Sequence, residues 1–243
     1  MLIENAGFKG IYVDKNLASG YTPDEIENFV NQRRRWAAGC IQTEKNYHIL
    51  NKKGLNFMQK CDYIFCINYW LFPIKIFFYL IAPILYTVFN VVIINSSAPV
   101  FLLMWLPQYI LKSFFVDKVY NSYKSTTWNK IYEVILFPKL IFTCIKELFG
   151  IKQKKFYVTK KKEQSNKVGK TQLQMIGAHA AFFIINFVAY YISSLKGFIL
   201  PAVFSIINLV YLTFAITFDS GITKKDSRAN PNNKKYTSIF KEK

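Results

Sequence analysis

The chain has 243 residues, of which 52% are hydrophobic and 18% aromatic, and its formal net charge at pH 7 is +18. A soluble domain seldom combines so apolar a composition with so strong a charge, because the two compete for the same surface. A nucleic-acid-binding protein would need a basic face on a soluble module, and none is recognisable. The composition therefore indicates an integral membrane protein and argues against nucleic acid as a partner.

The first residues have the pattern of neither a secretory signal nor an independent domain. Met1 to Gly7 lacks the charged start and the apolar core of a signal peptide. Phe8 to Val13 follows the pattern of a short strand, but one strand is too small to fold alone. We therefore expect this segment to be the remnant of an α/β domain whose main part lies upstream of Met1.

A helix with a distinctive face is predicted next. Thr22 is a candidate N-cap and Glu25 completes a capping box with it. Gln32, Arg35 and Trp36 then share one side of the helix. Arginine clamps phosphate oxygens, tryptophan stacks on sugar rings and glutamine binds hydroxyls, so the trio suits a sugar phosphate. The alternative is a basic amphipathic helix at a membrane surface, with Trp36 as its interface anchor.

Four apolar stretches are predicted to cross the membrane. A spanning helix needs about 20 mainly apolar residues. Ile76 to Ile94 is free of charge, and Ala98 to Val116 is a weaker span. The remaining two spans are Met175 to Leu195 and Gly197 to Phe218.

Two amphipathic segments are expected to lie along the membrane surface. Phe57 to Phe65 leads into the first span. The second segment has apolar residues at helical spacing, which are Ile141, Cys144, Ile145, Leu148 and Phe149. Such helices bury their apolar face at the headgroup level. A basic loop, Lys152 to Lys170, follows.

The charges predict the topology of these segments. Of the 32 Lys and Arg residues, 29 lie before Tyr63, within 117–171 or after Asp219. The positive-inside rule places these regions in the cytoplasm, so we expect a multi-pass protein of the cell membrane with both termini cytoplasmic. The chain then divides into the end of a cytosolic domain (1–50), an interfacial helix with two spans (51–116), a cytosolic interfacial helix and loop (117–171), two further spans (172–219) and a disordered basic tail (220–243).

The basic loop contains a second motif. Phe156, Val158, Thr159 and Lys161 form the pattern F-x-V-T-x-K. On its own, such a Lys-rich stretch is typical of a juxtamembrane patch that contacts anionic lipid. In combination with Q-x-x-R-W at 32–36, it resembles the bacterial cellulose synthases, which are processive family-2 glycosyltransferases. In that family the two patterns are the gating-loop motif and the acceptor-site signature, and the similar layout runs from Met1 to about Asp219.

The resemblance implies transfer of glucose from UDP-glucose to a growing β-1,4-glucan, which is exported across the membrane. Trp36 would stack under the terminal sugar of the acceptor, Arg35 would neutralise charge on the pyrophosphate, and Gln32 would position the acceptor. Thr159 and Lys161 would close over the nucleotide, because a hydroxyl and an ammonium can reach its phosphates.

The family mechanism also needs parts that we expect upstream of Met1. These are the Thr-Glu-Asp motif with the general base and the Asp-x-Asp residues that bind Mg²⁺ and nucleotide. No catalytic residue and no metal ligand is therefore assigned in this chain, which we expect to be inactive alone. The basic tail also lacks an R-x-x-x-R cluster for a cyclic dinucleotide.

The resulting prediction is a mostly α-helical integral membrane protein with four transmembrane helices, amphipathic interfacial helices and a small N-terminal remnant of a GT-A α/β catalytic domain. Its expected partners are UDP-glucose, the growing glucan and the lipid bilayer, and the family allows accessory export subunits. Two alternatives remain open. One is a non-catalytic channel or scaffold subunit that partners a separate catalytic chain, and the other is a synthase of another β-glycan.

Several further residues are predicted to have structural roles. The four cysteines have no metal-binding spacing and are expected to be reduced and packed. We expect His179 to form a helix–helix hydrogen bond rather than a proton relay, and the span asparagines Asn90, Asn186 and Asn208 to join helices rather than line a channel. Trp70 and Trp105 fit an interfacial aromatic belt, in which one or two aromatic residues can also serve as sugar platforms.

Overall fold

The computed structural model describes residues 1–11, 26–92, 97–119, 126–151 and 169–221, and the regular structure in these ranges is entirely helical. The helices are α1 (Leu2–Asn5), α2 (Ile26–Tyr47), the 3-10 helix η1 (Ile49–Asn51), α3 (Phe57–Trp70), α4 (Phe72–Phe89), α5 (Ala98–Val119), α6 (Thr126–Leu148), α7 (Lys170–Lys196) and α8 (Ile199–Gly221). A mostly helical fold is therefore confirmed.

The predicted N-terminal strand is not confirmed. Within Phe8 to Val13, residues 8–11 have no regular secondary structure, and the other two lie outside the described residues. A strand forms when a neighbouring strand completes its hydrogen bonds, and the described part of the chain offers none. The capping box of Thr22 and Glu25 also lies outside the described residues.

Three helices, α4, α7 and α8, are long and apolar enough to cross a membrane. The first begins earlier than predicted, at Phe72, because Pro73 suits the first turn of a helix. It ends where Asn90 adopts a left-handed conformation, with φ 54°. In α5 the apolar part, Pro99–Phe115, is shorter than in these three helices, because Asp117 and Lys118 follow it.

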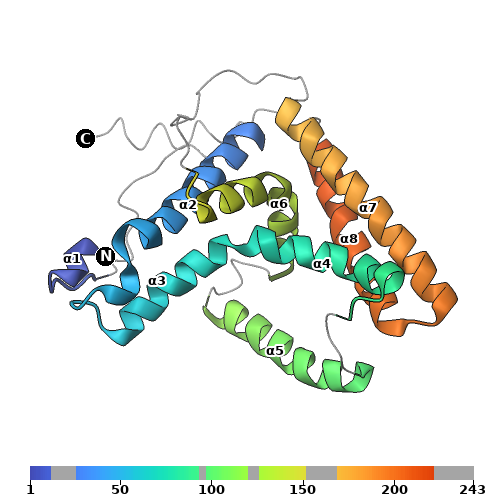
Figure 1. Cartoon of the computed structure of the whole chain (residues 1–243), viewed down its shortest axis with the longest axis horizontal. Helices are drawn as coiled ribbons and strands as arrows, with labels where there is room; N and C mark the ends of the chain where they lie inside the picture. Colours follow the sequence, from blue (N-terminus) through green and yellow to red (C-terminus); the bar gives the residue numbers. More distant parts are fainter. Residues whose placement is uncertain (12–25, 93–96, 120–125, 152–168, 222–243) are drawn as a thin grey trace, which may run out of the picture.

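Helices α2, α4, α7 and α8 lie around α6, as Figure 1 shows. α7 and α8 run side by side as an antiparallel pair, α3 leads into α4, and α6 packs against α2, α4 and α8. One cluster of buried apolar residues joins these elements, with Val30 from α2, Leu80 from α4, Phe137 from α6, Met175 from α7 and Leu212 from α8 among its members. Helix α2 and the candidate spans therefore share one core.

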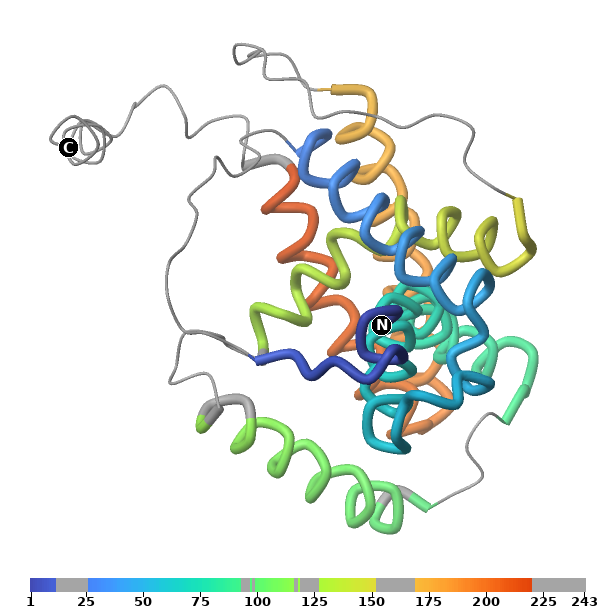
Figure 2. Tube along the Cα trace, turned by 90° about the vertical axis from the view of Figure 1, so that its left-hand side faces the viewer, coloured from blue at the N-terminus to red at the C-terminus, as the bar shows by residue number. Residues whose placement is uncertain are grey.

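α5 lies apart from the other helices in both views (Figures 1 and 2). None of its described side chains is buried. Its Phe101 ring meets Phe204 of α8 at 5.5 Å between centroids. An apolar helix that is exposed on all sides is suited to a lipid environment, where the bilayer covers it.

α6 forms where the sequence predicts an amphipathic helix, but its two faces have unexpected surroundings. The predicted apolar residues Ile145, Leu148 and Phe149 are exposed. Their polar counterparts Thr143 and Glu147 are buried, next to α2. Cys144 of the same stripe is fully buried, so only the exposed part at the end of α6 is directed away from the protein, where a bilayer surface can cover it.

Candidate functional site

The candidate acceptor helix α2 is fixed by its apolar face. Ile26, Val30, Ala37 and Ile41 recur at helical spacing and are buried. This leaves Gln32, Arg35 and Trp36 on a face that is partly or largely exposed. The three predicted residues therefore lie together on one side of one helix, as their spacing requires.

Three hydrogen bonds join α2 and α6, and in one of them Lys45 Nζ donates to the Leu148 carbonyl at 2.5 Å. Arg34 donates from Nε to Thr143 Oγ1 at 3.1 Å, and Gln42 donates from Nε2 to Glu147 Oε2 at 2.9 Å. Glu147 is almost fully buried, and its second oxygen, Oε1, has no hydrogen-bond partner among the described residues. Because a buried carboxylate is costly without partners, the bond from Gln42 is important for holding the two helices together.

The Trp36 side chain is 47% exposed and lies against a second tryptophan. The rings of Trp36 and Trp70 are 6.4 Å apart at an interplanar angle of 80°, which is an edge-to-face contact. Trp70 belongs to α3 and is buried, and its carbonyl accepts a hydrogen bond from the Cys144 thiol of α6 at 3.1 Å. The residue that supports Trp36 is therefore itself bonded to α6 through its backbone carbonyl.

Polar groups lie next to this aromatic pair. Tyr69 packs edge-to-face on Trp70 at 5.3 Å between centroids and is itself 45% exposed. Burial of part of the side chain raises the pKa of the Tyr69 hydroxyl, the Glu133 carboxylate raises it further, and Arg33 opposes the shift. The phenol is therefore protonated at neutral pH and can donate a hydrogen bond. Aromatic surfaces next to hydroxyl and guanidinium donors are suited to binding a carbohydrate.

Part of this arrangement was not predicted. Trp70 was expected mainly in an interfacial aromatic belt, and no role was predicted for Tyr69 or Arg33. A weaker signal was present in the order of the helices, since α2 and α3 follow each other in the chain, separated by residues 48–56, and consecutive elements usually lie next to each other. The predicted nucleotide-binding residues, which are Phe156, Val158, Thr159 and Lys161, lie outside the described residues.

The described residues do not provide a metal site. No group of three or more His, Cys, Asp or Glu side chains in the described ranges is arranged to hold a metal ion. The Mg²⁺ ion expected for the family therefore has no fitting ligands in this part of the chain, and no step proposed below depends on it.

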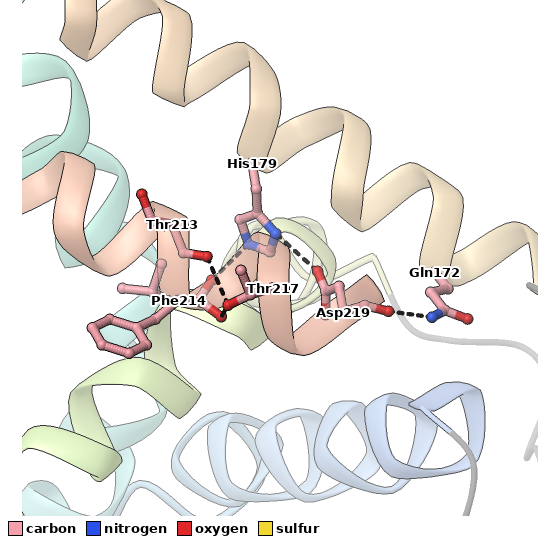
Figure 3. Close-up of polar contacts among 7 residues, drawn as sticks. Gln172, His179, Thr213, Phe214, Thr217 and Asp219 are labelled. Atoms are coloured by element: carbon pink, nitrogen blue, oxygen red, sulfur yellow. Dashed lines mark hydrogen bonds and ion pairs between the residues drawn. The ribbon is translucent and has the colours of Figure 1, made fainter. Parts of the chain in front are cut away.

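A second polar cluster lies where α6, α7 and α8 meet (Figure 3). His179 of α7 faces the Asp219 carboxylate of α8, with Nδ1 3.0 Å from Oδ2. Its Nε2 lies 2.9 Å from the Val134 carbonyl of α6, and because a carbonyl can only accept, Nε2 carries a hydrogen and donates it. Gln172 also donates to the backbone carbonyl of Asp219. His179 thus forms the predicted helix–helix hydrogen bond, and it joins three helices.

The span asparagines form a third polar cluster. Asn186 of α7 donates to the Leu80 carbonyl of α4 at 3.0 Å. Asn208 of α8 donates to the Tyr79 carbonyl at 2.9 Å and to Asn186 Oδ1 at 2.8 Å. Both side chains therefore join α4, α7 and α8, as predicted for helix–helix contacts in a membrane. Asn90 instead ends α4.

The class of protein is indicated by a family comparison. Residues 1–116, which include α2, α3, α4 and most of α5, match the family model "Glycosyl transferase family group 2". The matched segment contains the complete Q-x-x-R-W pattern and the Trp36–Trp70 contact.

The more specific similarity is to cellulose synthases. The chain is 25% identical over 159 residues to a cellulose synthase catalytic subunit (UDP-forming) of Pseudomonas fluorescens (strain SBW25), covering 65% of this chain and 22% of that protein. It is 25% identical over 159 residues to cellulose synthase 2 of Novacetimonas hansenii, covering 65% of this chain and 10% of that protein. A third relative, the catalytic subunit of Komagataeibacter sucrofermentans, is 24% identical over 227 residues, with 88% and 30% covered.

These matches confirm the resemblance to bacterial cellulose synthase catalytic subunits that the two motifs indicated. They also give its extent, because the chain spans between 10% and 30% of the length of these three relatives.

Proposed function

We propose that the chain forms the acceptor-binding and membrane part of a processive, inverting glycosyltransferase that polymerises UDP-glucose into β-1,4-glucan and translocates the product. The observation that carries this proposal is the half-exposed indole of Trp36. It stands on the helix that also bears Gln32 and Arg35, and it is supported by Trp70 next to the start of a candidate span.

The location of the aromatic group suits the transfer of a polymer into a membrane. Trp70 ends α3 and α4 begins at Phe72, so the rings lie where the cytosolic helices meet the first candidate span. A sugar stacked on Trp36 would therefore be at the membrane entrance. In the proposed mechanism Gln32 orients the acceptor, Arg35 balances charge on the pyrophosphate, and Thr159 and Lys161 cover the nucleotide.

The proposed topology has four spans. α4, α7 and α8 meet the length and composition of spanning helices, and we assign α5 as the fourth because its shorter apolar part is exposed on all sides. Four spans place both termini and residues 152–170 in the cytoplasm, in agreement with the distribution of Lys and Arg.

The proposal is tested by measuring cello-oligosaccharide binding to the whole chain in lipid nanodiscs. Trp36→Ala should abolish binding of cellohexaose, measured by titration calorimetry, because the sugar loses its stacking surface. Trp36→Phe should retain part of the affinity. Trp105→Ala is the matched control, since Trp105 lies on the separate helix α5 and should leave binding unchanged. Wild-type affinity in Trp36→Ala would make α2 a membrane-surface helix only.

A channel or scaffold subunit that partners a separate catalytic chain is the second candidate. It is favoured by the absence of a metal-binding cluster from the described residues. The two candidates differ in the genome, where an in-frame Thr-Glu-Asp motif upstream of Met1 would support the enzyme. Both predict a sugar platform at Trp36, so the binding test applies to each of them.

A further inference from the structure

The indole of Trp36 is held by a residue that the Q-x-x-R-W signature leaves unspecified. The guanidinium carbon of Arg33 lies over the Trp36 ring, 4.9 Å from its centroid. The same guanidinium lies over the Phe29 ring at 5.1 Å. Positions 29, 33 and 36 are four and three residues apart, so they share one side of α2. The three side chains therefore form a stack along the helix, with the cation between two aromatic rings.

Ring contacts rather than a hydrogen bond at Nε account for the position of this guanidinium. Arg33 Nε is buried and has no hydrogen-bond partner in the described part of the chain. A guanidinium is planar and weakly hydrated, and it stacks well on aromatic faces. Neighbouring Arg34 is different, because its Nε is bonded to Thr143 of α6.

The surroundings of Trp36 leave room for a ligand. Arg33 covers one face of the indole, and Trp70 meets it edge-to-face at 80°. The side chain nevertheless stays 47% exposed. A sugar ring needs a flat partner at a fixed angle, and an indole that rotates freely must lose that freedom when the sugar binds.

We propose that Arg33 is a positioning residue for Trp36: stacked between Phe29 and Trp36, it fixes the plane of the indole so that the free face meets a sugar ring. This inference rests on the proposed function, because the acceptor sugar is the occupant assigned to that face. Arg33 acts through Trp36 and does not itself contact the sugar.

The test uses the 243-residue chain in nanodiscs, with Arg33→Met, Arg33→Lys and the matched control Arg34→Met. The first measurement is the near-ultraviolet circular dichroism of the Trp36–Trp70 pair, obtained by subtracting the spectrum of Trp36→Phe. The second is the affinity for cellohexaose. Arg33→Met should lose the signal of the pair and bind roughly fivefold more weakly, which corresponds to one cation–π contact at a half-exposed ring.

The other two variants distinguish the effect of the cation on the Trp36 ring from the effect of the total charge of α2. Arg33→Lys should restore most of the spectrum and of the affinity, because an ammonium also interacts with the ring face. Arg34→Met removes the same charge from the neighbouring position together with the bond to Thr143, so its affinity reports the loss of that bond, whereas the spectrum of the Trp36–Trp70 pair should stay as in the wild type. A purely structural role of Arg33 would not be rescued by lysine.

The outcomes distinguish this inference from the proposed function. Wild-type spectrum and affinity in Arg33→Met would overturn the inference, as would a changed spectrum with unchanged affinity or a loss that Arg33→Lys does not restore. If Trp36→Ala bound cellohexaose as strongly as the wild type, the proposed function would fail, and Arg33 would have no sugar platform to position.

Discussion

The buried pair of His179 and Asp219 gives a sharp prediction of non-additive stability. Both side chains are fully buried, and Asp219 Oδ1 has no hydrogen-bond partner among the described residues. His179→Leu removes the partner of Oδ2 as well, so the carboxyl group would be buried without a bond at either oxygen. Removing one partner of such a buried pair costs about 3–5 kcal/mol.

Asp219→Leu should lower the free energy of unfolding less than His179→Leu does, and in the double variant the two losses should partly cancel. Asp219→Leu leaves Nδ1 of a neutral imidazole unbonded, while Nε2 still donates to the Val134 carbonyl, so we expect a cost of about 1–3 kcal/mol. The double variant contains no isolated carboxyl group. It should therefore be more stable than His179→Leu by about 2 kcal/mol, because two leucines replace a buried carboxyl group that has lost its partner.

The assay is chemical unfolding of the chain in detergent micelles, followed by far-ultraviolet circular dichroism. Ordinary polar contacts between membrane helices couple by about 0.6 kcal/mol on average and by about 1.7 at most. We expect the coupling of His179 and Asp219 to exceed this range, because a carboxyl group is involved. A double variant less stable than His179→Leu would refute the reasoning.

Three further predictions follow from the topology and from single buried groups. In sealed vesicles, a membrane-impermeant maleimide should label Ser97→Cys from the outer side, whereas Thr159→Cys should react only after permeabilisation; the opposite pattern would reverse the proposed topology. Burial raises the pKa of the Cys144 thiol to about 11, and since the thiolate is the reactive form, alkylation of the folded chain at pH 8 should modify exposed Cys66 and leave Cys144 unmodified until the pH approaches 11, as mass spectrometry of digested protein can show. Ser205 has a buried hydroxyl oxygen with no partner among the described residues, so Ser205→Ala should leave the unfolding midpoint unchanged or raise it by the equivalent of about 1 kcal/mol, and a clear loss would reveal a bond to that oxygen.

The candidate spans were predictable because their signal is local. α7 and α8 contain long stretches without charge, so hydropathy finds them within a few residues of their observed ends. α4 was placed about four residues too late at its start and about five too late at its end, because Pro73 starts the helix and Asn90 stops it. Hydropathy does not contain these two signals, which depend on backbone conformation.

The orientation of α6 could not be predicted from periodicity. The predicted apolar stripe is divided in the structure, because Cys144 is fully buried whereas Ile145 is exposed. In a soluble protein that stripe would face the core, but in a membrane protein lipid is equally apolar, so the period does not tell which side faces the protein. The bonds that decide it, from Arg34 to Thr143 and from Gln42 to Glu147, join residues more than 100 positions apart.

The candidate site, too, could be predicted from residue spacing only in part. The spacing of Gln32, Arg35 and Trp36 was enough to place them on one side of a helix. It was not enough to find Trp70, which contacts Trp36 from a different helix, or the stack of Arg33 on two rings. A spacing rule states which side chains share a helix face, whereas contacts between helices depend on the tertiary fold.

The hydrogen bonds between α2 and α6, from Arg34, Gln42 and Lys45, also limit how the acceptor helix can move. A helix held at one point can pivot and turn about its axis, whereas a helix held at two separated points has lost both freedoms. Arg34 and Gln42 are about 12 Å apart along α2, at 1.5 Å per residue, and Trp36 lies between them. Under the proposed function, the ring beneath the sugar is a stationary reference point, so each cycle of elongation must advance the polymer past the helix and leave the helix where it was.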